Sequence, residues 1–232
     1  ALTICLVSGG MDPMWERDAV TRDEVVRLLK EQGLPDERID HSVKVADLAL
    51  RISDLLIIDG LKVQKAVVEK GALLHDIGYL QCTGEPVQIP GWKAYGIRIP
   101  SDDINHPVTG AIIAKSWGFS DEVADCVLRH NIGAFTVEDC TLLRIKPLPE
   151  KDCAPVTREE KIVHYADHLM LLKKLKLDPL KDQAAPAKAC LPWLRHYFKE
   201  RANMKIEIDN PIAQREVGLN NELKKYLRNL SY

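Results

Sequence analysis

Residues 71–80 read GALLHDIGYL. Four residues suited to a buried helix are followed directly by a histidine and an aspartate, with a glycine two positions later. Burying an ionised carboxylate is costly unless the group is paired with a counter-charge or a metal ion. His75 and Asp76 therefore mark a place where a core helix ends in side chains that need a partner.

The composition is that of an ordinary globular chain. It has 232 residues, of which 46% are hydrophobic and 28% charged, enough for one sizeable core or for a core with a small appendage. A net charge of −2 gives no overall basic footprint for nucleic acid. The six cysteines include no CxxC pair, and no apolar run is long enough for a membrane span. We therefore expect reduced thiols, no membrane partner and a cytoplasmic location.

Helical periodicity dominates the chain. Two irregular stretches, 81–105 and 132–156, interrupt it, and ordered loops of that length are often lids or binding loops. No convincing set of alternating strands is present, so the predicted fold class is all-α. The predicted helices cover residues 21–33, 35–56, 61–78, 106–118, 120–130, 157–175, 186–202 and 211–229.

Potential metal ligands recur along these helices. Their spacings of 34, 30, 24 and 37 residues each correspond to one helix plus a connection, so a bundle can direct them at a shared point. Four imidazoles and two carboxylates suit iron, manganese or zinc better than calcium or magnesium, although magnesium and nickel stay open. The carboxylate of Asp76 is suited to bridge two ions. The six candidates are His41, His75, Asp76, His106, His130 and Asp167.

The order of these residues resembles a known family. His41, the HDIG tetrapeptide at 75–78 and Asp167 are similar to the HD-domain superfamily of metal-dependent phosphohydrolases, and the resemblance covers about residues 35–172. The histidines in HPVTGAIIA and VLRHNIGA resemble those of two-metal members, including HD-type diadenosine tetraphosphate hydrolases. NIGAFT follows where cyclic-dinucleotide phosphodiesterases carry a GYP motif, which argues against cyclic-di-GMP as substrate.

The resemblance implies an HD-domain helical bundle with additional C-terminal helices. Together with the helical pattern on either side of it, the resemblance divides the chain into an N-terminal extension at 1–20, a metal-binding catalytic domain at 21–178 and a C-terminal helical extension at 179–232 packed on the core. It also implies that His41, His75, Asp76 and Asp167 hold one metal ion, and that Asp76 bridges to a second ion held by His106 and His130. Asp76, His106 and His130 are then the expected catalytic residues.

The activity that the resemblance implies is hydrolysis of a phosphate ester or anhydride by a metal-activated water, with a nucleotide as the expected substrate. Lys93, Arg98 and Lys146 lie in the irregular stretches and are candidates to bind its phosphates, although a loop cation is usually only solvated. Trp92, in the same stretch as Lys93, either stacks on a base or anchors the loop to the core.

Three further histidines have other expected roles. His164 precedes Asp167 by three residues and shares its helix face, so it is expected to support the site or to pack. His168 is expected at the surface. His196 is expected to be a structural or exposed residue of a C-terminal helix.

Two other functions remain open. HD-type mixed-valent di-iron oxygenases have a similar ligand set and use O₂ to cleave a carbon–carbon or carbon–phosphorus bond. A regulatory module that binds a nucleotide without turnover is the second alternative, but such modules usually have ligand positions replaced, and here all are present. The C-terminal helices either cap the core or form a homodimer contact.

Overall fold

The computed structural model describes residues 19–131 and 134–227, so most of the expected N-terminal extension at 1–20 lies outside the described residues. The predicted all-α class is confirmed. The helices are α1 (Arg22–Glu31), α2 (Asp36–Ile58), α3 (Lys65–Leu74), α4 (His106–Ser116), α5 (Asp121–Leu128), α6 (Val137–Leu142), α7 (Arg158–Lys174), α8 (Ala185–Ala202) and α9 (Pro211–Leu227). Short 3₁₀ helices are η2 (Ile77–Gln81), η3 (Lys93–Tyr95) and η4 (Asp103–Asn105), and two short strands are β1 (Pro86–Gln88) and β2 (Arg98–Pro100).

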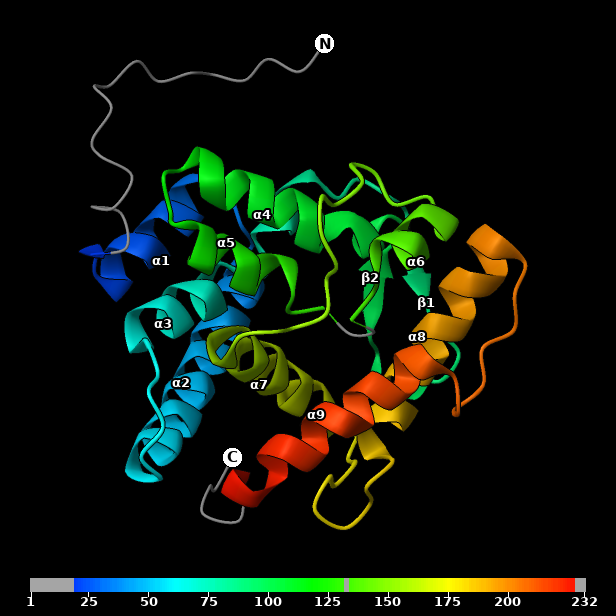
Figure 1. Ribbon diagram of the computed structural model, residues 1–232. Coiled ribbons are helices and arrows are strands. Elements are labelled where there is room, and N and C mark those ends of the chain that lie inside the picture. The colour runs from blue at the N-terminus through cyan, green and yellow to red at the C-terminus, as the bar shows by residue number, and fades with distance from the viewer. Residues whose placement is uncertain (1–18, 132–133, 228–232) are drawn as a thin grey trace.

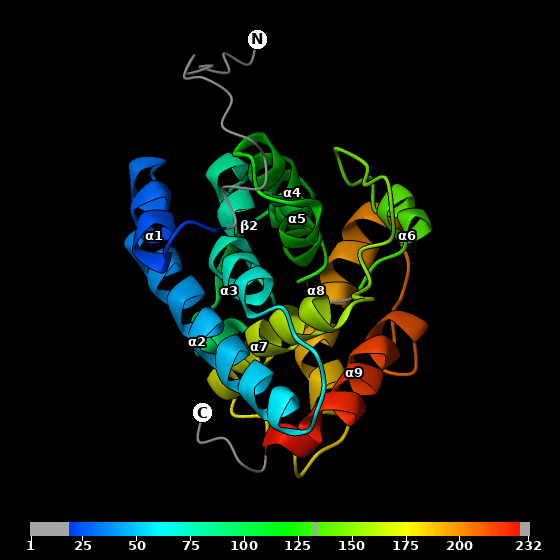
Figure 2. The ribbon, with the colours of Figure 1, turned by 60° about the vertical axis from the view of Figure 1, so that its left-hand side comes forward.

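Helices α2, α3 and α7 pack against one another, with α2 and α3 on the left of Figure 1 and α7 beside them towards the middle. Helix α3 packs against α2, α5 and α7, and α4 packs against α5 and η2. On its other side α7 contacts α8 and α9, which also pack on each other (Figure 2). A single hydrophobic cluster extends from α1 to α9, so the helices share one core.

Several helices begin where capping residues predict. The Thr157 side chain accepts a hydrogen bond from the backbone N–H of Glu160, whose carboxylate accepts one from the Thr157 N–H, which confirms the predicted capping box of α7. Helix α3 was predicted to begin too early. The structure starts it at Lys65, because the backbone N–H of Gln64 donates to the carboxylate of Glu159 outside the helix.

Two glycines in the opening stretch permit close approaches between elements. A Cβ at Gly71 on α3 would lie 2.4 Å from the Cβ of Cys126 on α5. A Cβ at Gly78 would lie 1.9 Å from the carbonyl oxygen of His106 at the start of α4. Glycine at these positions therefore lets α5 and α4 reach the segment that carries His75 and Asp76.

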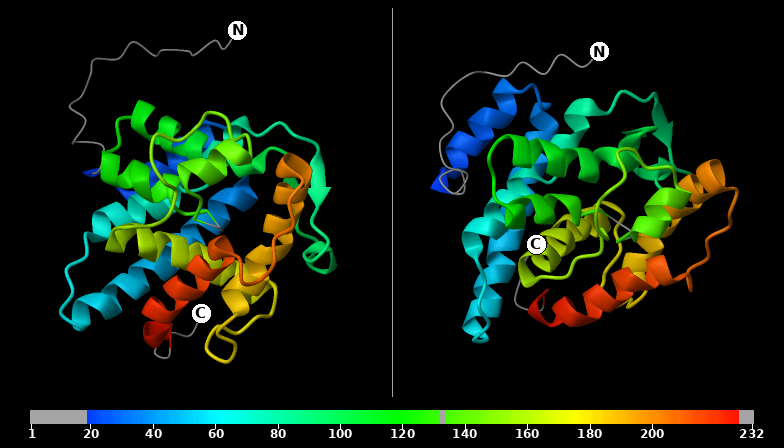
Figure 3. Two further views of the ribbon diagram at one scale, coloured as in Figure 1. Left: turned by 45° about the vertical axis from the view of Figure 1, so that its right-hand side comes forward. Right: turned by 45° about the horizontal axis from the view of Figure 1, so that its top comes forward.

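The two irregular stretches contain more regular structure than the sequence predicts. In the first, β1 and β2 pair antiparallel with Val87 opposite Ile99, and Figure 3 shows this pair at the edge of the molecule beside α8. The indole N–H of Trp92 donates to the carbonyl of Ala189 on α8 at 2.9 Å, which supports its expected role as an anchor. The second stretch contains α6, which a capping box at Thr136 and Asp139 starts.

The five cysteines in the described part of the chain are free thiols. Among the described residues, no helix has both the length and the apolar character needed to cross a membrane.

Candidate metal centre

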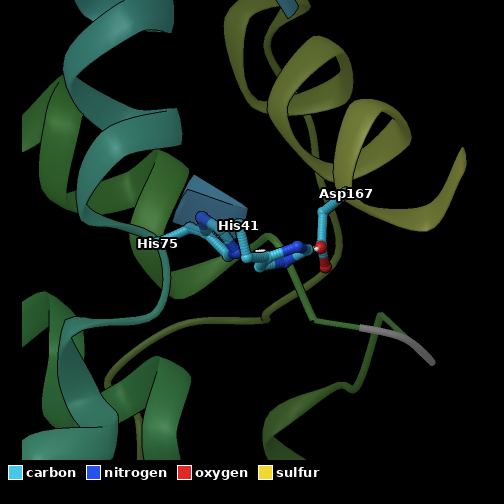
Figure 4. Close-up of side chains that lie close together, drawn as sticks. All are labelled: His41, His75 and Asp167. Atoms are coloured by element: carbon cyan, nitrogen blue, oxygen red, sulfur yellow. Dashed lines mark hydrogen bonds and ion pairs between the residues drawn. The ribbon is translucent and has the colours of Figure 1, made fainter. Parts of the chain in front are cut away.

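The first half of the centre joins α2, α3 and α7. Figure 4 shows His41, His75 and Asp167 pointing toward one another from these three elements. The Nε2 of His41 lies 2.9 Å from Oδ1 of Asp167, and the Nε2 of His75 lies 3.6 Å from the same oxygen. Residues 126 positions apart in the sequence are thus brought within ligand distance of one point.

The second half is arranged around Asp76, which follows His75 between α3 and η2. Its Oδ1 lies 3.5 Å from Nε2 of His75, 3.6 Å from Nε2 of His106 and 4.0 Å from Nε2 of His130. His106 is the first residue of α4, and His130 stands two positions after the end of α5. The structure therefore brings all six candidate side chains together, with Asp76 between the two sets as a bridging role requires.

Backbone carbonyls fix the orientation of three of the imidazoles. The Nδ1 atoms of His75, His106 and His130 lie 2.7, 2.5 and 2.6 Å from the carbonyl oxygens of the residues three positions earlier. Since a carbonyl only accepts hydrogen bonds, each Nδ1 carries a proton, and Nε2 is the ring nitrogen directed at the centre. Metal-bound histidines are usually oriented in this way.

Two contacts indicate that a cation belongs between these rings. The Nε2 atoms of His106 and His130 lie 2.9 Å apart, although both are oriented as lone-pair donors. The buried Nε2 of His75 has no hydrogen-bond partner. Lone pairs that converge in this way repel one another unless a proton or a metal ion lies between them, so the donor set fits a metal ion.

The protonation states suit the same purpose. Burial lowers the pKa of His106 to about 4 and that of His130 well below its ordinary range, so both rings are neutral at pH 7. Burial opposes ionisation of Asp76, but the charges of His75 and Arg38 outweigh it and hold the pKa of Asp76 below its ordinary value. His106 and His130 are thus neutral and Asp76 is ionised, which are the forms of these side chains that bind metals.

Arg38 is a site residue that the sequence analysis missed. Its Nη1 lies 3.0 Å from Oδ2 of Asp76, and its guanidinium lies 3.7 Å from the ring centre of Tyr79, which in turn stacks on His106. Arg38 precedes His41 by three residues on α2, so helical spacing alone could have placed the two on one face.

A cavity of about 690 Å³ lies beside the centre, and five of the six candidate side chains line it, all except His75. Of the three proposed phosphate-binding residues, Arg98 lines this cavity, whereas Lys93 and Lys146 are exposed elsewhere and give no support for that role. Sequence reasoning missed the other cations and the aromatic groups of the wall, which are Arg38, Lys44, Lys173, Lys174, Tyr79 and Trp193.

The histidines on either side of Asp167 are both buried. His168 is 2% exposed, so its expected surface position is wrong. His164 is also buried, and both rings contact Glu216 of α9. His196 is half-buried on α8.

Buried Asp103 connects this site to the C-terminal helices. Its carboxylate accepts hydrogen bonds from the hydroxyls of Tyr197 and Tyr79 and from the indole N–H of Trp193. Burial outweighs these donors and raises the pKa of Asp103 to about 7. Its backbone carbonyl is the group that orients His106, so α8 and the metal-ligand segment are held by the same residue.

Sequence comparisons find curated proteins that are similar to part of this chain. A tRNA (cytidine(56)-2'-O)-methyltransferase of Picrophilus torridus is 31% identical over 153 residues, which are 66% of this chain but only 37% of that protein. An uncharacterized protein of Methanocaldococcus jannaschii is 31% identical over 60% of this chain and 70% of its own length. A symmetrical bis(5'-nucleosyl)-tetraphosphatase of Staphylococcus aureus is 26% identical over 70% of this chain and 73% of its own length. No solved structure gives a significant match.

The family described as HD domain matches residues 38–171. This range is more than half of the chain and includes all six converging side chains. The chain therefore belongs to the HD domain family.

Proposed function

We propose that this protein is a metal-dependent phosphohydrolase that cleaves a phosphate ester or anhydride of a nucleotide. In this proposal His41, His75, Asp76 and Asp167 hold one divalent transition metal ion, iron, manganese or zinc. Asp76, His106 and His130 hold a second. The observation that carries the proposal is the convergence of metal-ligating atoms from five helical segments beside one cavity.

When bound, such ions supply an activated water and neutralise charge on the phosphoryl oxygens. The protein's own contribution begins with Arg38. Its guanidinium is fixed by Asp76 and by the ring of Tyr79, and it also faces the cavity. An arginine held in this way is suited to orient a phosphoryl group without losing side-chain freedom at the moment of binding.

The cavity rim supports a substrate with more than one phosphate. Arg98, Lys173 and Lys174 line the cavity and form no ion pair with any described residue, whereas Lys44 pairs with Asp40 at 2.5 Å. Unpaired cations at the entrance attract phosphates beyond the one at the metal centre. The tetraphosphatase relative acts, by its name, on such a compound.

Metal loading and turnover test the proposal together. The chelated protein is reloaded with Mn²⁺, Fe²⁺ or Zn²⁺, and phosphate release is measured on mononucleotides, cyclic nucleotides and dinucleoside polyphosphates. Asp76→Ala should lose metal and turnover together, whereas the control Asp209→Ala changes an exposed turn residue and should behave as wild type. Full activity in Asp76→Ala would refute the assignment. Iron-dependent O₂ consumption without phosphate release would favour the oxygenase alternative, and nucleotide binding without turnover the regulatory one.

The rim is tested separately. A Lys173→Ala/Lys174→Ala double variant should raise KM for a dinucleoside tetraphosphate more than for a mononucleotide. Lys181→Ala is the matched control, because Lys181 is exposed outside the cavity and pairs with Asp178. Equal effects on both substrates would remove the argument for a polyphosphate.

A further inference from the structure

A second cluster of potential metal ligands lies behind the HD centre. His164 and His168 are four residues apart on α7 and so share a face, and Glu216 reaches them from α9. The Oε2 atom of Glu216 lies 2.9 Å from Nε2 of His164 and 2.8 Å from Nδ1 of His168. All three residues are 2% exposed or less. None of them belongs to the six residues of the HD centre.

The contact between His164 and Glu216 depends on which nitrogen of His164 carries a proton. The Nδ1 of His164 lies 3.0 Å from the carbonyl oxygen of Arg129, so Nδ1 carries a proton and a neutral His164 presents a lone pair to Glu216. A lone pair cannot donate to a carboxylate. The contact therefore requires either an added proton, on His164 Nε2 or on the Glu216 carboxyl group, or a metal ion shared by the three side chains.

At His164 the arrangement repeats the pattern of the HD centre. There, too, a backbone carbonyl fixes Nδ1 and leaves Nε2 directed at a carboxylate, as in His106 and Asp76. The Oε2 atom of Glu216 lies as close to the two histidine nitrogens, at 2.9 and 2.8 Å, as Asp167 lies to His41, at 2.9 Å. Two imidazoles and one carboxylate suit zinc, whereas calcium and magnesium prefer oxygen donors throughout.

We propose that His164, His168 and Glu216 form an additional transition-metal site, with zinc as the simplest occupant. Three protein donors leave the fourth position of a tetrahedral ion to water. The buried Nε2 of His168 has no partner, but one unpaired N–H is a small cost beside the binding free energy of zinc.

A metal ion at this position would hold together the parts that carry HD ligands. Helix α7 bears Asp167 between the two histidines, and the Arg129 carbonyl that orients His164 belongs to the residue before His130. Glu216 comes from α9, beyond the residues that match the HD family. The site therefore has a structural role, which ties the C-terminal helix to two ligand-bearing segments.

Counting bound zinc tests the site without relying on any activity. The protein is saturated with zinc, desalted and analysed for zinc per chain, as wild type and as Glu216→Gln, His164→Gln and His196→Gln. Glu216→Gln and His164→Gln should each lose one equivalent relative to wild type, and the wild-type Tm should fall on chelation more than that of Glu216→Gln. His196→Gln removes a half-buried histidine outside the cluster and should keep the wild-type count.

An unchanged zinc count in both cluster variants would overturn the proposal and leave an added proton between His164 and Glu216 as the correct description. If either variant fails to fold, anomalous diffraction from zinc-soaked wild-type crystals decides. A peak at about 2.0–2.1 Å from His164 Nε2 is expected, and its absence refutes the site. Because the HD ligands are intact in these variants, failure here leaves the proposed hydrolase function standing.

Discussion

Replacing Gly78 by alanine should disrupt half of the metal centre. The added Cβ would lie 1.9 Å from the carbonyl oxygen of His106, 2.6 Å from its carbonyl carbon and 2.8 Å from its Cα. These are backbone atoms, which cannot turn away as a flexible side chain does. Ordinary contact begins at 3.4 Å, so the His106 backbone must retreat by about 1.5 Å, the difference between the two distances. Metal–ligand distances tolerate only about ±0.2 Å.

We therefore expect Gly78→Ala to keep the ion of His41, His75 and Asp167 but to lose the ion that His106 and His130 hold. Forced overpacking should also lower the free energy of unfolding by about 1–3 kcal/mol. Elemental analysis gives the metal count, urea denaturation gives stability, and phosphate release gives activity. Gly218→Ala is the control, because Gly218 is exposed on α9 with nothing within 4 Å of an added Cβ. That change should stabilise by up to about 1 kcal/mol.

Wild-type metal content and stability in Gly78→Ala would show that the close approach of η2 to α4 does not position His106. Loss of both ions would show instead that the two halves of the centre cannot form separately.

Two further predictions concern charged groups at the cavity. Arg38→Ala removes the charge-assisted hydrogen bond to Asp76, worth about 1.5–3 kcal/mol, so kcat/KM for phosphate release should fall about 10- to 100-fold. The control is Arg51→Ala, which changes an exposed arginine on the same helix and should leave kcat/KM unchanged. Asp103 has a pKa of about 7 in the folded protein, above the ordinary value of 3.8. Between these pH values the folded state keeps a proton that the unfolded state releases. The free energy of unfolding therefore falls as pH rises from about 4 to about 7. The shift corresponds to about 4 kcal/mol in the metal-free protein. Urea denaturation across this range should show the slope flattened in Asp103→Asn, and parallel curves for the two proteins would contradict the assignment.

Local signals in the sequence predicted much of the fold. Capping residues such as Thr157 act on their own helix, and the helical period marks which face is buried, so most helices follow from neighbouring residues. The strand pair was missed because it depends on contacts between Val87 and Ile99 across a loop rich in proline and glycine. Helix α6 is only six residues long, too short for a periodic pattern to reveal it.

The candidate site was predictable to the extent that ligand types recur at one per helix. The surroundings of the site were not. Glu216 lies 48 residues after His168 in the sequence, and only the packing of α9 on α7 shows that they meet. Lys173 and Lys174 lie in the last turn of α7, where a basic side chain also complements the helix dipole, and nothing local distinguishes that role from a place on a cavity wall.

Helix α8 helps to shape the cavity, although it supplies none of the six candidate metal ligands. It lies beyond the HD family match, yet Trp193 forms part of the cavity wall and Ala189 holds the loop of Trp92. Neither residue belongs to the ligand set. Trp193 and Tyr197 of α8 also donate hydrogen bonds to Asp103, whose carbonyl orients His106. A substitution on this helix that reshapes the cavity must therefore keep these contacts if the candidate ligand set is to keep its geometry.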